Sequence, residues 1–220
     1  MNLHTLDASW DSKITDQGIK HMDLRVLDAS NNPNITDQGI KDMNLHTLII
    51  DDKSGITDQG IKDLNLRILR AAYNTKITNE GIKDLDLYEL DASGTCGITD
   101  EGIRHQNLGI LRASNNKYIT DTGISHMSLK VLYASGHCGI TDKSLRYFNL
   151  QLLDASYNKN ITDVGLKHLN LEMLNATENE MITNQGIQHM NLRSLIAVFN
   201  DKITISGVKH MKLEEFINRD

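Results

Sequence analysis

One stretch of 21 residues is repeated ten times along this chain without an insertion or deletion. The dipeptide Ile-Thr marks each copy and begins at residues 14, 35, 56, 77, 98, 119, 140, 161, 182 and 203. A repeat this short cannot bury its own apolar face, so neighbouring copies must stack on one another. The sequence therefore predicts a solenoid that forms one domain, residues 1–220, with ten repeats and a terminal half-repeat.

The pattern within one repeat predicts a strand followed by a short helix. We number its slots from the first Leu, which gives the consensus L-x-x-L-D-A-S-x-N-x-x-I-T-D-x-G-I-K-x-M-N. Its apolar fourth and sixth slots alternate with polar ones, as in a short strand with one buried face. The apolar twelfth, seventeenth and twentieth slots favour a short helix or 3₁₀ segment. Stacked copies then form an α/β solenoid whose parallel sheet has strands about four residues long.

Polar residues at fixed slots predict how each repeat is held. Thr fills slot 13 in all ten copies and suits a helix N-cap, while the Asp that usually follows favours the positive end of the helix. Gly at slot 16 is expected to allow close packing against the adjacent turn. Asn at slot 9 is expected to bond backbone groups of its own and neighbouring turns. A ladder of such Asn residues is a structural feature.

A second period of 42 residues is superimposed on the first. Repeats three, five and seven replace the slot-9 Asn and place Gly at slot 11; the residues concerned are Lys53, Thr95 and His137, and Gly55, Gly97 and Gly139. This alternation predicts two loop shapes along one edge of the sheet.

Composition and charge exclude several classes of protein. The net charge of −6 and the pI of about 5.8 argue against a phosphate-binding surface, so we expect no nucleic-acid partner. No apolar run approaches the roughly 20 residues of a membrane helix, and the chain enters its first repeat without a signal segment. We therefore expect no membrane partner.

The cysteines favour a cytoplasmic location. Cys96 and Cys138 occupy equivalent slots two repeats apart, too far to pair within one solenoid, and thiols without a disulfide framework fit a reducing compartment. Export is the alternative, because the triplets that begin at Asn34, Asn160 and Asn175 would then be glycosylation acceptors. A repeat rich in Asn and Thr produces such triplets by accident.

The segment L-x-x-L-x-A-x-x-N-x-x-I resembles the leucine-rich repeat, and I-T-D-x-G-I resembles the tail of its cysteine-containing subclass. The match covers essentially the whole chain, although Ala replaces the usual third Leu and each repeat is shorter than that subclass generally uses. Cys96 and Cys138 lie one place after its Cys. The resemblance implies a curved solenoid with a concave sheet, convex helices and a protein partner on the sheet. Attached to an F-box segment, such repeats recognise substrates of ubiquitin ligases.

Slot 5 varies while the rest of the repeat stays constant, and it is expected to face outward from the concave sheet. It reads Asp7, Asp28, Ile49, Arg70, Asp91, Arg112, Tyr133, Asp154, Asn175 and Ile196. Slot 8 adds Trp10, Tyr73, Tyr157 and Phe199 at the edge. Arg and aromatic residues make good interface anchors. We predict a protein-binding surface at Arg70, Tyr73, Asp91, Arg112, Tyr133 and Asp154; the alternative is an ordinary solvated repeat surface.

No other residue pattern in the sequence indicates metal binding or catalysis. Slot 19 carries a column of histidines, His21, His105, His126, His168, His189 and His210, but no second ligand type converges with it, so we expect no metal and no cofactor. Asp, Ser and His lie in separate columns without a nucleophile beside a base, so we expect no enzyme. Ice binding by the Thr column is disfavoured, because Thr is needed as a cap.

The ends of the array suggest a further hypothesis. The chain opens on Leu3 without a capping repeat, whereas Asn218 and added charges alter the final half-repeat. The natural protein is then longer, or the first repeat stacks against another copy to form a homodimer. A structural or self-associating array is thus the alternative to a binding scaffold. Gln106 and Ser144 break their columns, and we expect looser packing in their repeats.

Overall fold

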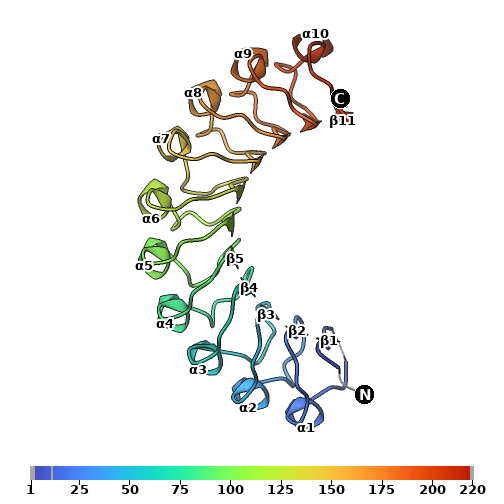
Figure 1. Ribbon diagram of the computed structural model, residues 1–220, viewed down its shortest axis with the longest axis vertical. Helices are drawn as coiled ribbons and strands as arrows, with labels where there is room; N and C mark the ends of the chain where they lie inside the picture. The colour runs from blue at the N-terminus through green and yellow to red at the C-terminus, as the bar shows by residue number, and fades with distance from the viewer. Residues whose placement is uncertain (1–2, 11, 219–220) are drawn as a thin grey trace. The chain divides into compact units, whose positions relative to one another are not determined.

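A computed structural model describes residues 3–10 and 12–218, and strands alternate with short helices throughout (Figure 1). The residues group into two compact units, Met1–Leu108 and Gly109–Asp220. In each unit the strands lie along the inner face and the helices along the outer face. The predicted α/β leucine-rich repeat solenoid is confirmed by this layering.

Neighbouring strands of the first unit pair in parallel, in chain order and with equal slots opposite one another. These strands are β1 (Thr5–Asp7), β2 (Val26–Asp28), β3 (Thr47–Ile49), β4 (Ile68–Arg70) and β5 (Glu89–Asp91). The helices that follow them are α1 (Asp16–Ile19), α2 (Asp37–Ile40), α3 (Asp58–Ile61), α4 (Asn79–Ile82) and α5 (Asp100–Ile103).

The second unit repeats this arrangement. Its parallel strands are β6 (Ile110–Arg112), β7 (Val131–Tyr133), β8 (Leu152–Asp154), β9 (Met173–Asn175), β10 (Ser194–Ile196) and β11 (Glu215–Ile217). Its helices are α6 (Asp121–Ile124), α7 (Asp142–Leu145), α8 (Asp163–Leu166), α9 (Asn184–Ile187) and α10 (Ile205–Val208). The strands are one residue shorter than the sequence predicts.

The apolar slots form the core between sheet and helices. In the fourth repeat Leu69 and Ala71 are buried at slots 4 and 6, and Ile77 and Ile82 are buried at slots 12 and 17. Removing such side chains from water is the main force that stacks the repeats. The inward slots of the strand are therefore those that the alternation predicts.

Hydrogen bonds to the preceding repeat help to fix the shape that the repeats share. Thr57 caps α3 by accepting from the Gln59 N–H, as predicted. Its own hydroxyl and N–H both donate to the Asp37 carboxylate of the preceding repeat, at 2.7 Å. The slot-14 Asp therefore does more than favour a helix dipole, because it joins two repeats.

Gly at slot 16 makes room for that carboxylate. A Cβ atom on Gly60 would lie 2.3 Å from Asp37 Oδ1, far inside van der Waals contact. The helix here needs no left-handed backbone, since no slot-16 Gly has a positive φ among those that the structure describes. Close packing, as expected, explains this glycine.

The Asn ladder is present, and its side chains are buried. Asn179 Nδ2 donates to the carbonyls of Ala155, Asn158 and Ile161 in the preceding repeat at 2.8–3.1 Å. Its Oδ1 accepts from the Met181 N–H at 3.1 Å. One side chain thus satisfies several backbone groups that would be costly to bury without partners.

Two loop shapes alternate, as the 42-residue period predicts. In repeats three, five and seven the slot-11 glycines form isolated parallel bridges to the slot-13 Thr of the preceding repeat, at Gly55, Gly97 and Gly139. A Cβ on Gly139 would lie 2.7 Å from the Ile119 carbonyl oxygen, so only Gly fits there. Repeats two, four, six, eight, nine and ten carry the slot-9 Asn of the ladder instead, so the alternation ends at repeat seven.

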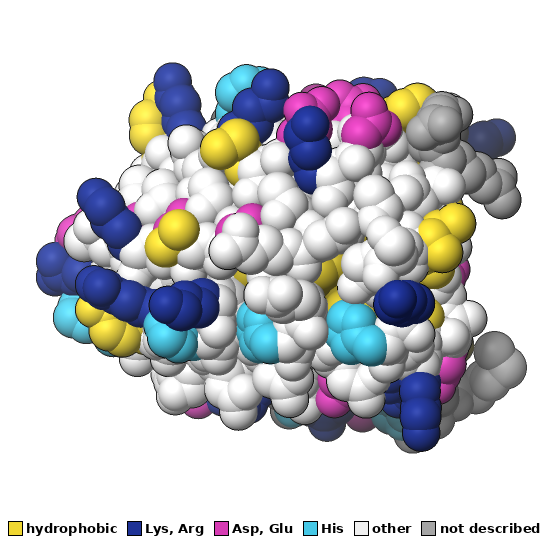
Figure 2. Space-filling view, turned by 90° about the horizontal axis from the view of Figure 1, so that it is seen from above, with side chains coloured by type: hydrophobic (Ala, Val, Ile, Leu, Met, Phe, Trp, Pro, Cys, Tyr) yellow, Lys and Arg dark blue, Asp and Glu magenta, His cyan; other side chains and the backbone are white. Residues whose placement is uncertain are grey.

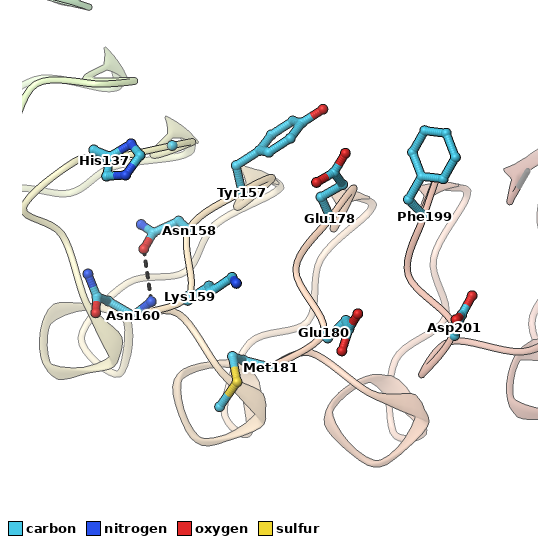
Figure 3. A pocket seen from close by; sticks show the side chains of 11 residues that line it. His137, Tyr157, Asn158, Lys159, Asn160, Glu178, Glu180, Met181, Phe199 and Asp201 are labelled. Atoms are coloured by element: carbon cyan, nitrogen blue, oxygen red, sulfur yellow. Dashed lines mark hydrogen bonds between the residues drawn. The ribbon is translucent and has the colours of Figure 1, made fainter. Parts of the chain in front are cut away.

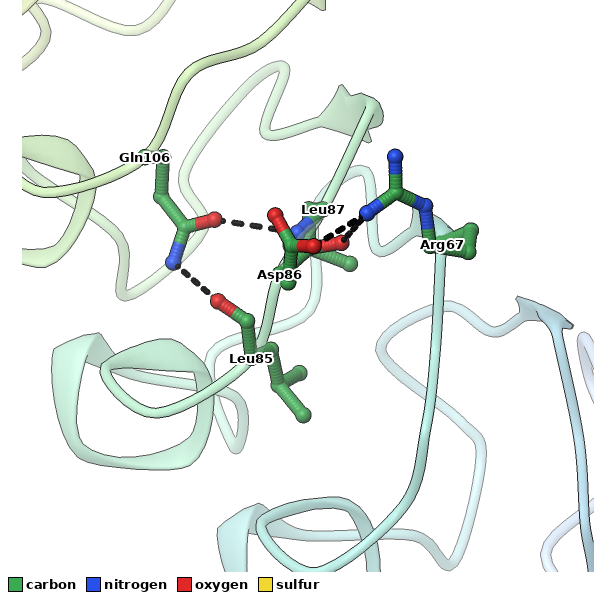
Figure 4. Close-up of polar contacts among 5 residues, drawn as sticks. All are labelled: Arg67, Leu85, Asp86, Leu87 and Gln106. Atoms are coloured by element: carbon green, nitrogen blue, oxygen red, sulfur yellow. Dashed lines mark hydrogen bonds and ion pairs between the residues drawn. The ribbon is translucent and has the colours of Figure 1, made fainter.

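Gln106 is held by several hydrogen bonds, in contrast with the looser packing expected there. Its Nε2 donates to Leu85 O at 2.8 Å, and its Oε1 accepts from the Leu87 N–H at 3.1 Å (Figure 4). Nε2 also donates to Ile82 O at 3.0 Å. Arg67 bonds Asp86 beside this cluster. Ser144 is also buried, and its hydroxyl donates to Thr141 O at 3.3 Å.

Candidate functional site

The sheet face of the first unit places Arg70 beside Asp91. These residues lie opposite each other at the ends of β4 and β5. Arg70 Nε donates to Glu89 Oε1 at 2.9 Å, and the Glu89 side chain is only 7% exposed. The Arg70 side chain stays 42% exposed above it. Arg70 therefore offers a positioned guanidinium that is already partly neutralised.

The predicted aspartates have local roles as well. Asp91 Oδ1 accepts from the Ser93 N–H at 3.0 Å. Asp154 Oδ1 accepts from both the N–H and the hydroxyl of Ser156, at 3.0 and 2.6 Å. The recurring Asp-Ala-Ser sequence is therefore partly a turn-stabilising device. This assigns a structural part to two residues that the sequence suggests only as partner contacts.

In the second unit Arg112, Tyr133 and Asp154 follow one another across β6, β7 and β8. The Arg112 guanidinium carbon lies 4.8 Å from the centre of the Tyr133 ring, within cation–π distance. A shallow hollow of about 180 Å³ borders this stack; Tyr133, Asp154 and Met173 are among its lining residues. The three predicted residues therefore form one continuous half-buried surface.

Tyr73 lies on the loop edge instead, where slot 8 has an unusual backbone. Its φ is +60°, and its ring lies over Gly94 of the next repeat. A Cβ on Gly94 would be 2.4 Å from ring atoms. Tyr73 therefore follows β4 but belongs to a different surface from Arg70.

Slot 8 is left-handed in both units, except at Asp52. The residues with positive φ there are Trp10, Asn31, Tyr73, Gly94, Asn115, Gly136, Tyr157, Glu178 and Phe199. The slot is the third position of a tight turn, closed for example by the 3.2 Å bond from Asn158 N to Ala155 O. Gly and Asn suit that position, whereas other residues lose about 1–2 kcal/mol. The aromatic side chains at slot 8 are therefore held in strained positions.

A groove of about 1130 Å³ runs along the loop edge of the second unit (Figure 3). We call it the loop-edge groove; its main lining side chains are Tyr157, Glu178, Phe199, Glu180, Met181 and Asp201. Tyr157, Glu178 and Phe199 stand side by side along its upper border in Figure 3. Slots 8, 10 and 11 of successive repeats supply all six residues.

The sequence gives only a partial signal for this groove. Its aromatic residues stand out at slot 8, but Glu178, Glu180 and Asp201 look like ordinary surface carboxylates until the repeats are stacked. Backbone bonds, such as the 2.9 Å bonds from Tyr157 N to Thr177 O and from Glu178 N to Val198 O, fix the turns that bring them together.

The cysteines lie in the core below the loop edge. Cys96 and Cys138 are buried and donate to the carbonyls of Ala92 and Ala134, each at 3.1 Å. Burial raises the pKa of the Cys138 thiol from 9.0 to about 11. Such a thiol is poorly suited to nucleophilic chemistry near neutral pH, because its thiolate is scarce.

Histidines recur along the helical side of the described residues. Figure 2 shows histidine side chains following one another across one face of the molecule. His168, His189 and His210 are exposed, and His189 Nε2 lies 3.0 Å from Leu169 O. Within residues 3–10 and 12–218, no three His, Cys, Asp or Glu side chains are grouped to hold a metal ion. No described helix has the length and apolar character of a membrane span.

Comparisons with known proteins support the fold. Neither a protein-family profile nor a curated protein matches the sequence. Among solved structures, the yeast Rad7 and Elc1 complex contains a chain with 15% identity and a TM-score of 0.57, and the match covers 98% of this chain and 81% of that one. The TLR13–ssRNA13 complex gives 17% identity and a TM-score of 0.62 over 99% of this chain and 36% of that one. This chain therefore has a leucine-rich repeat type of fold.

Proposed function

We propose that the chain is a non-enzymatic scaffold that binds a partner protein through the sheet faces of a single repeat domain. The observation that carries this proposal is the Arg112–Tyr133 stack beside Asp154, because a rigid aromatic residue and an Arg next to a hollow are the usual anchors of an interface. On the other unit, Arg70 and Asp91 lie opposite each other on neighbouring strands and add one charged side chain of each sign.

A protein partner is favoured over a nucleic acid by charge. One structural neighbour is described as a complex with a protein and the other as a complex with single-stranded RNA. This chain has a net charge of −6, and a surface that binds phosphates is normally basic. The buried thiols fit our proposals of a cytoplasmic location and of the cysteine-containing subclass. Recognition of ubiquitin-ligase substrates would further require an attached F-box segment.

The test compares capture by three purified chains in a broad lysate, read by mass spectrometry. The test variant carries Arg70→Ala, Arg112→Ala and Tyr133→Ala. Its control carries Arg104→Ala, Arg146→Ala and Tyr147→Ala on the helical side. These residues match the ion pair of Arg70 and the cation–π contact of Arg112 with Tyr133. Arg104 pairs with Glu101 at 2.9 Å, and Arg146 stacks on Tyr147 at 4.7 Å.

A partner that is retained by the wild type and by the control but lost from the sheet variant would support the proposal. Identical captures by all three chains would contradict it. They would favour the second candidate, self-association through Leu3 and Leu6, which are half-exposed whereas Leu24 and Leu27 are fully buried. Sedimentation of a Leu3→Glu, Leu6→Glu variant would then show whether a homodimer depends on them.

A further inference from the structure

We propose that the loop-edge groove binds a segment of a protein that carries arginine or lysine side chains. This site is separate from the sheet face. Tyr157, Phe199 and Met181 are each about half exposed, at 54%, 55% and 47%, and Glu178, Glu180 and Asp201 supply carboxylates between them. Aromatic faces next to carboxylates form the environment that a guanidinium or ammonium group prefers.

The backbone supports a binding role for the upper border. Tyr157, Glu178 and Phe199 have φ values of +59°, +52° and +53° in three consecutive repeats. The same slot holds Gly94, Asn115 and Gly136 in the repeats before them, where the residue suits its conformation. Strained backbone of this kind is concentrated at functional sites, and here it fixes the direction of three successive exposed side chains.

The negative charge of the loop-edge groove favours a cationic partner segment. The groove is lined by three carboxylates and by one lysine, Lys159. None of the ion pairs formed by the described residues uses Glu178, Glu180 or Asp201, so these carboxylates remain available to a cation. Phosphate groups would be repelled by the same residues.

Shape favours an extended segment over a small molecule. Repeats rise by about 4.8 Å each, so the border from Tyr157 to Phe199 extends for roughly 10 Å. The groove volume of about 1130 Å³ exceeds the roughly 300–1,000 Å³ of most small-molecule sites. Several side chains of a peptide fit along such a groove, with basic groups reaching the carboxylates between the rings.

The test uses fluorescein-labelled octapeptides that are identical except at three positions. One carries three arginines separated by Gly or Ser, one carries neutral citrulline there, and one carries glutamate. A single-stranded thymidine octamer represents nucleic acid. Fluorescence anisotropy is measured up to millimolar protein. We expect the arginine peptide to bind at least tenfold more tightly than each of the others.

Two groove variants should each reduce arginine-peptide binding at least tenfold. One carries Tyr157→Gly and Phe199→Gly, which relieve the left-handed strain and so preserve folding. The other carries Glu178→Gln, Glu180→Gln and Asp201→Asn.

Matched controls keep the result specific. Trp10→Gly with Tyr73→Gly removes two aromatic residues from the same slot elsewhere, and Asp42→Asn, Asp63→Asn and Asp84→Asn neutralise three exposed carboxylates on the helical side. Both controls, and the sheet variant of Arg70, Arg112 and Tyr133, should bind like the wild type. Equal binding of the arginine and citrulline peptides, preference for the oligonucleotide, no binding at all, or groove variants that bind normally would each overturn the proposal.

Discussion

The hydroxyl of Thr162 donates a 2.7 Å hydrogen bond to Oδ2 of Asp142, which belongs to the preceding repeat. The Thr162 N–H donates to Oδ1 of the same carboxylate, also at 2.7 Å. The residue that caps one helix is therefore anchored by the first residue of the helix before it. The same pair of bonds recurs between other repeats, for example between Asp163 and Thr183.

Loss of this carboxylate should destabilise the fold. Asp142→Ala leaves two donors of Thr162 without their acceptor, and we expect the free energy of unfolding to fall by about 1.5–3 kcal/mol. Asp142→Asn should cost less than about 1 kcal/mol. In the native chain Asn79 already bonds Thr99 in this manner, with the hydroxyl as acceptor. Urea unfolding would measure the stability of both variants. Equal losses in the Ala and Asn variants would contradict the role of this side chain as the acceptor for Thr162.

Gly186 and Gly18 should respond in opposite directions to alanine. A Cβ on Gly186 would lie 2.2 Å from Asp163 Oδ1, whereas a Cβ on Gly18 would meet only Ile14 Cγ2 at 3.9 Å. Gly186→Ala should lower the thermal midpoint. Gly18→Ala should leave it unchanged or raise it, because Ala is favoured over Gly in a helix by about 0.5–1 kcal/mol. Similar losses in the two variants would contradict close packing at slot 16.

Cys138 should make stability depend on alkaline pH. Its folded pKa of about 11 lies above its ordinary value of 9.0, so the protonated thiol stabilises the folded chain fully below pH 9, and this contribution is lost as pH rises toward 11. The expected loss by pH 11 is about 2 kcal/mol. The control is Cys138→Ser, since Ser54 is buried at the equivalent slot. The free energies of unfolding of the two chains, measured at pH 8, 9, 10 and 11, should converge as the pH rises. A difference between the chains that stays constant with pH would contradict the prediction.

Tyr157→Gly should preserve or increase stability. The left-handed cost of about 1–2 kcal/mol disappears, and the added chain entropy of Gly offsets roughly 0.5–1 kcal/mol of that gain. We therefore expect the free energy of unfolding to rise by up to about 1 kcal/mol. Tyr118 is a similarly exposed tyrosine without a positive φ, so Tyr118→Gly should lose stability under the same conditions. A clear loss in the Tyr157 variant would show that its ring contributes more to folding than its backbone costs.

Gln106→Leu should speed hydrogen exchange locally, at the backbone amide of Leu87. The Leu87 N–H loses its 3.1 Å bond to Oε1, and its hydrogen exchange should become faster relative to the Gly81 N–H, which bonds Thr78 O. A shift shared by both amides would indicate global destabilisation instead. In the native chain we expect protection in this repeat to equal that of its neighbours, because the Gln106 side chain is 3% exposed and hydrogen-bonded through both its nitrogen and its oxygen.

Much of the fold could be predicted because the repeat fixes its own geometry. Alternation of Leu and Ala specified the strand, invariant Thr specified the cap, and Gly at slots 11 and 16 indicated close packing and a second loop shape. The Asp–Thr bond between repeats was not predicted, because a carboxylate after an N-cap already has a sufficient local explanation. Likewise, a Gln in a Leu/Met column suggests a defect until its three backbone partners are known.

The candidate sites were less predictable for a different reason. Arg112, Tyr133 and Asp154 share one slot, so stacking alone brings them together, and the sequence could identify them. The loop-edge groove combines three slots of three repeats, and its backbone conformation contradicts the usual preferences of Tyr and Phe. Sequence propensity predicts Gly or Asn at a left-handed position, so the strained aromatic residues become visible only in three dimensions.

The Asn ladder has a consequence for how such a chain can evolve. Asn179 and Asn200 bond backbone groups of the repeat immediately before them, so the same connection can be made wherever another copy follows. Within repeats two to seven, where the two loop types alternate, gain or loss of 42 residues by recombination between gene segments would preserve both the Asn bonds and the alternation. The length of the array, and with it the reach of its surfaces, can therefore vary between lineages without the invention of a new fold.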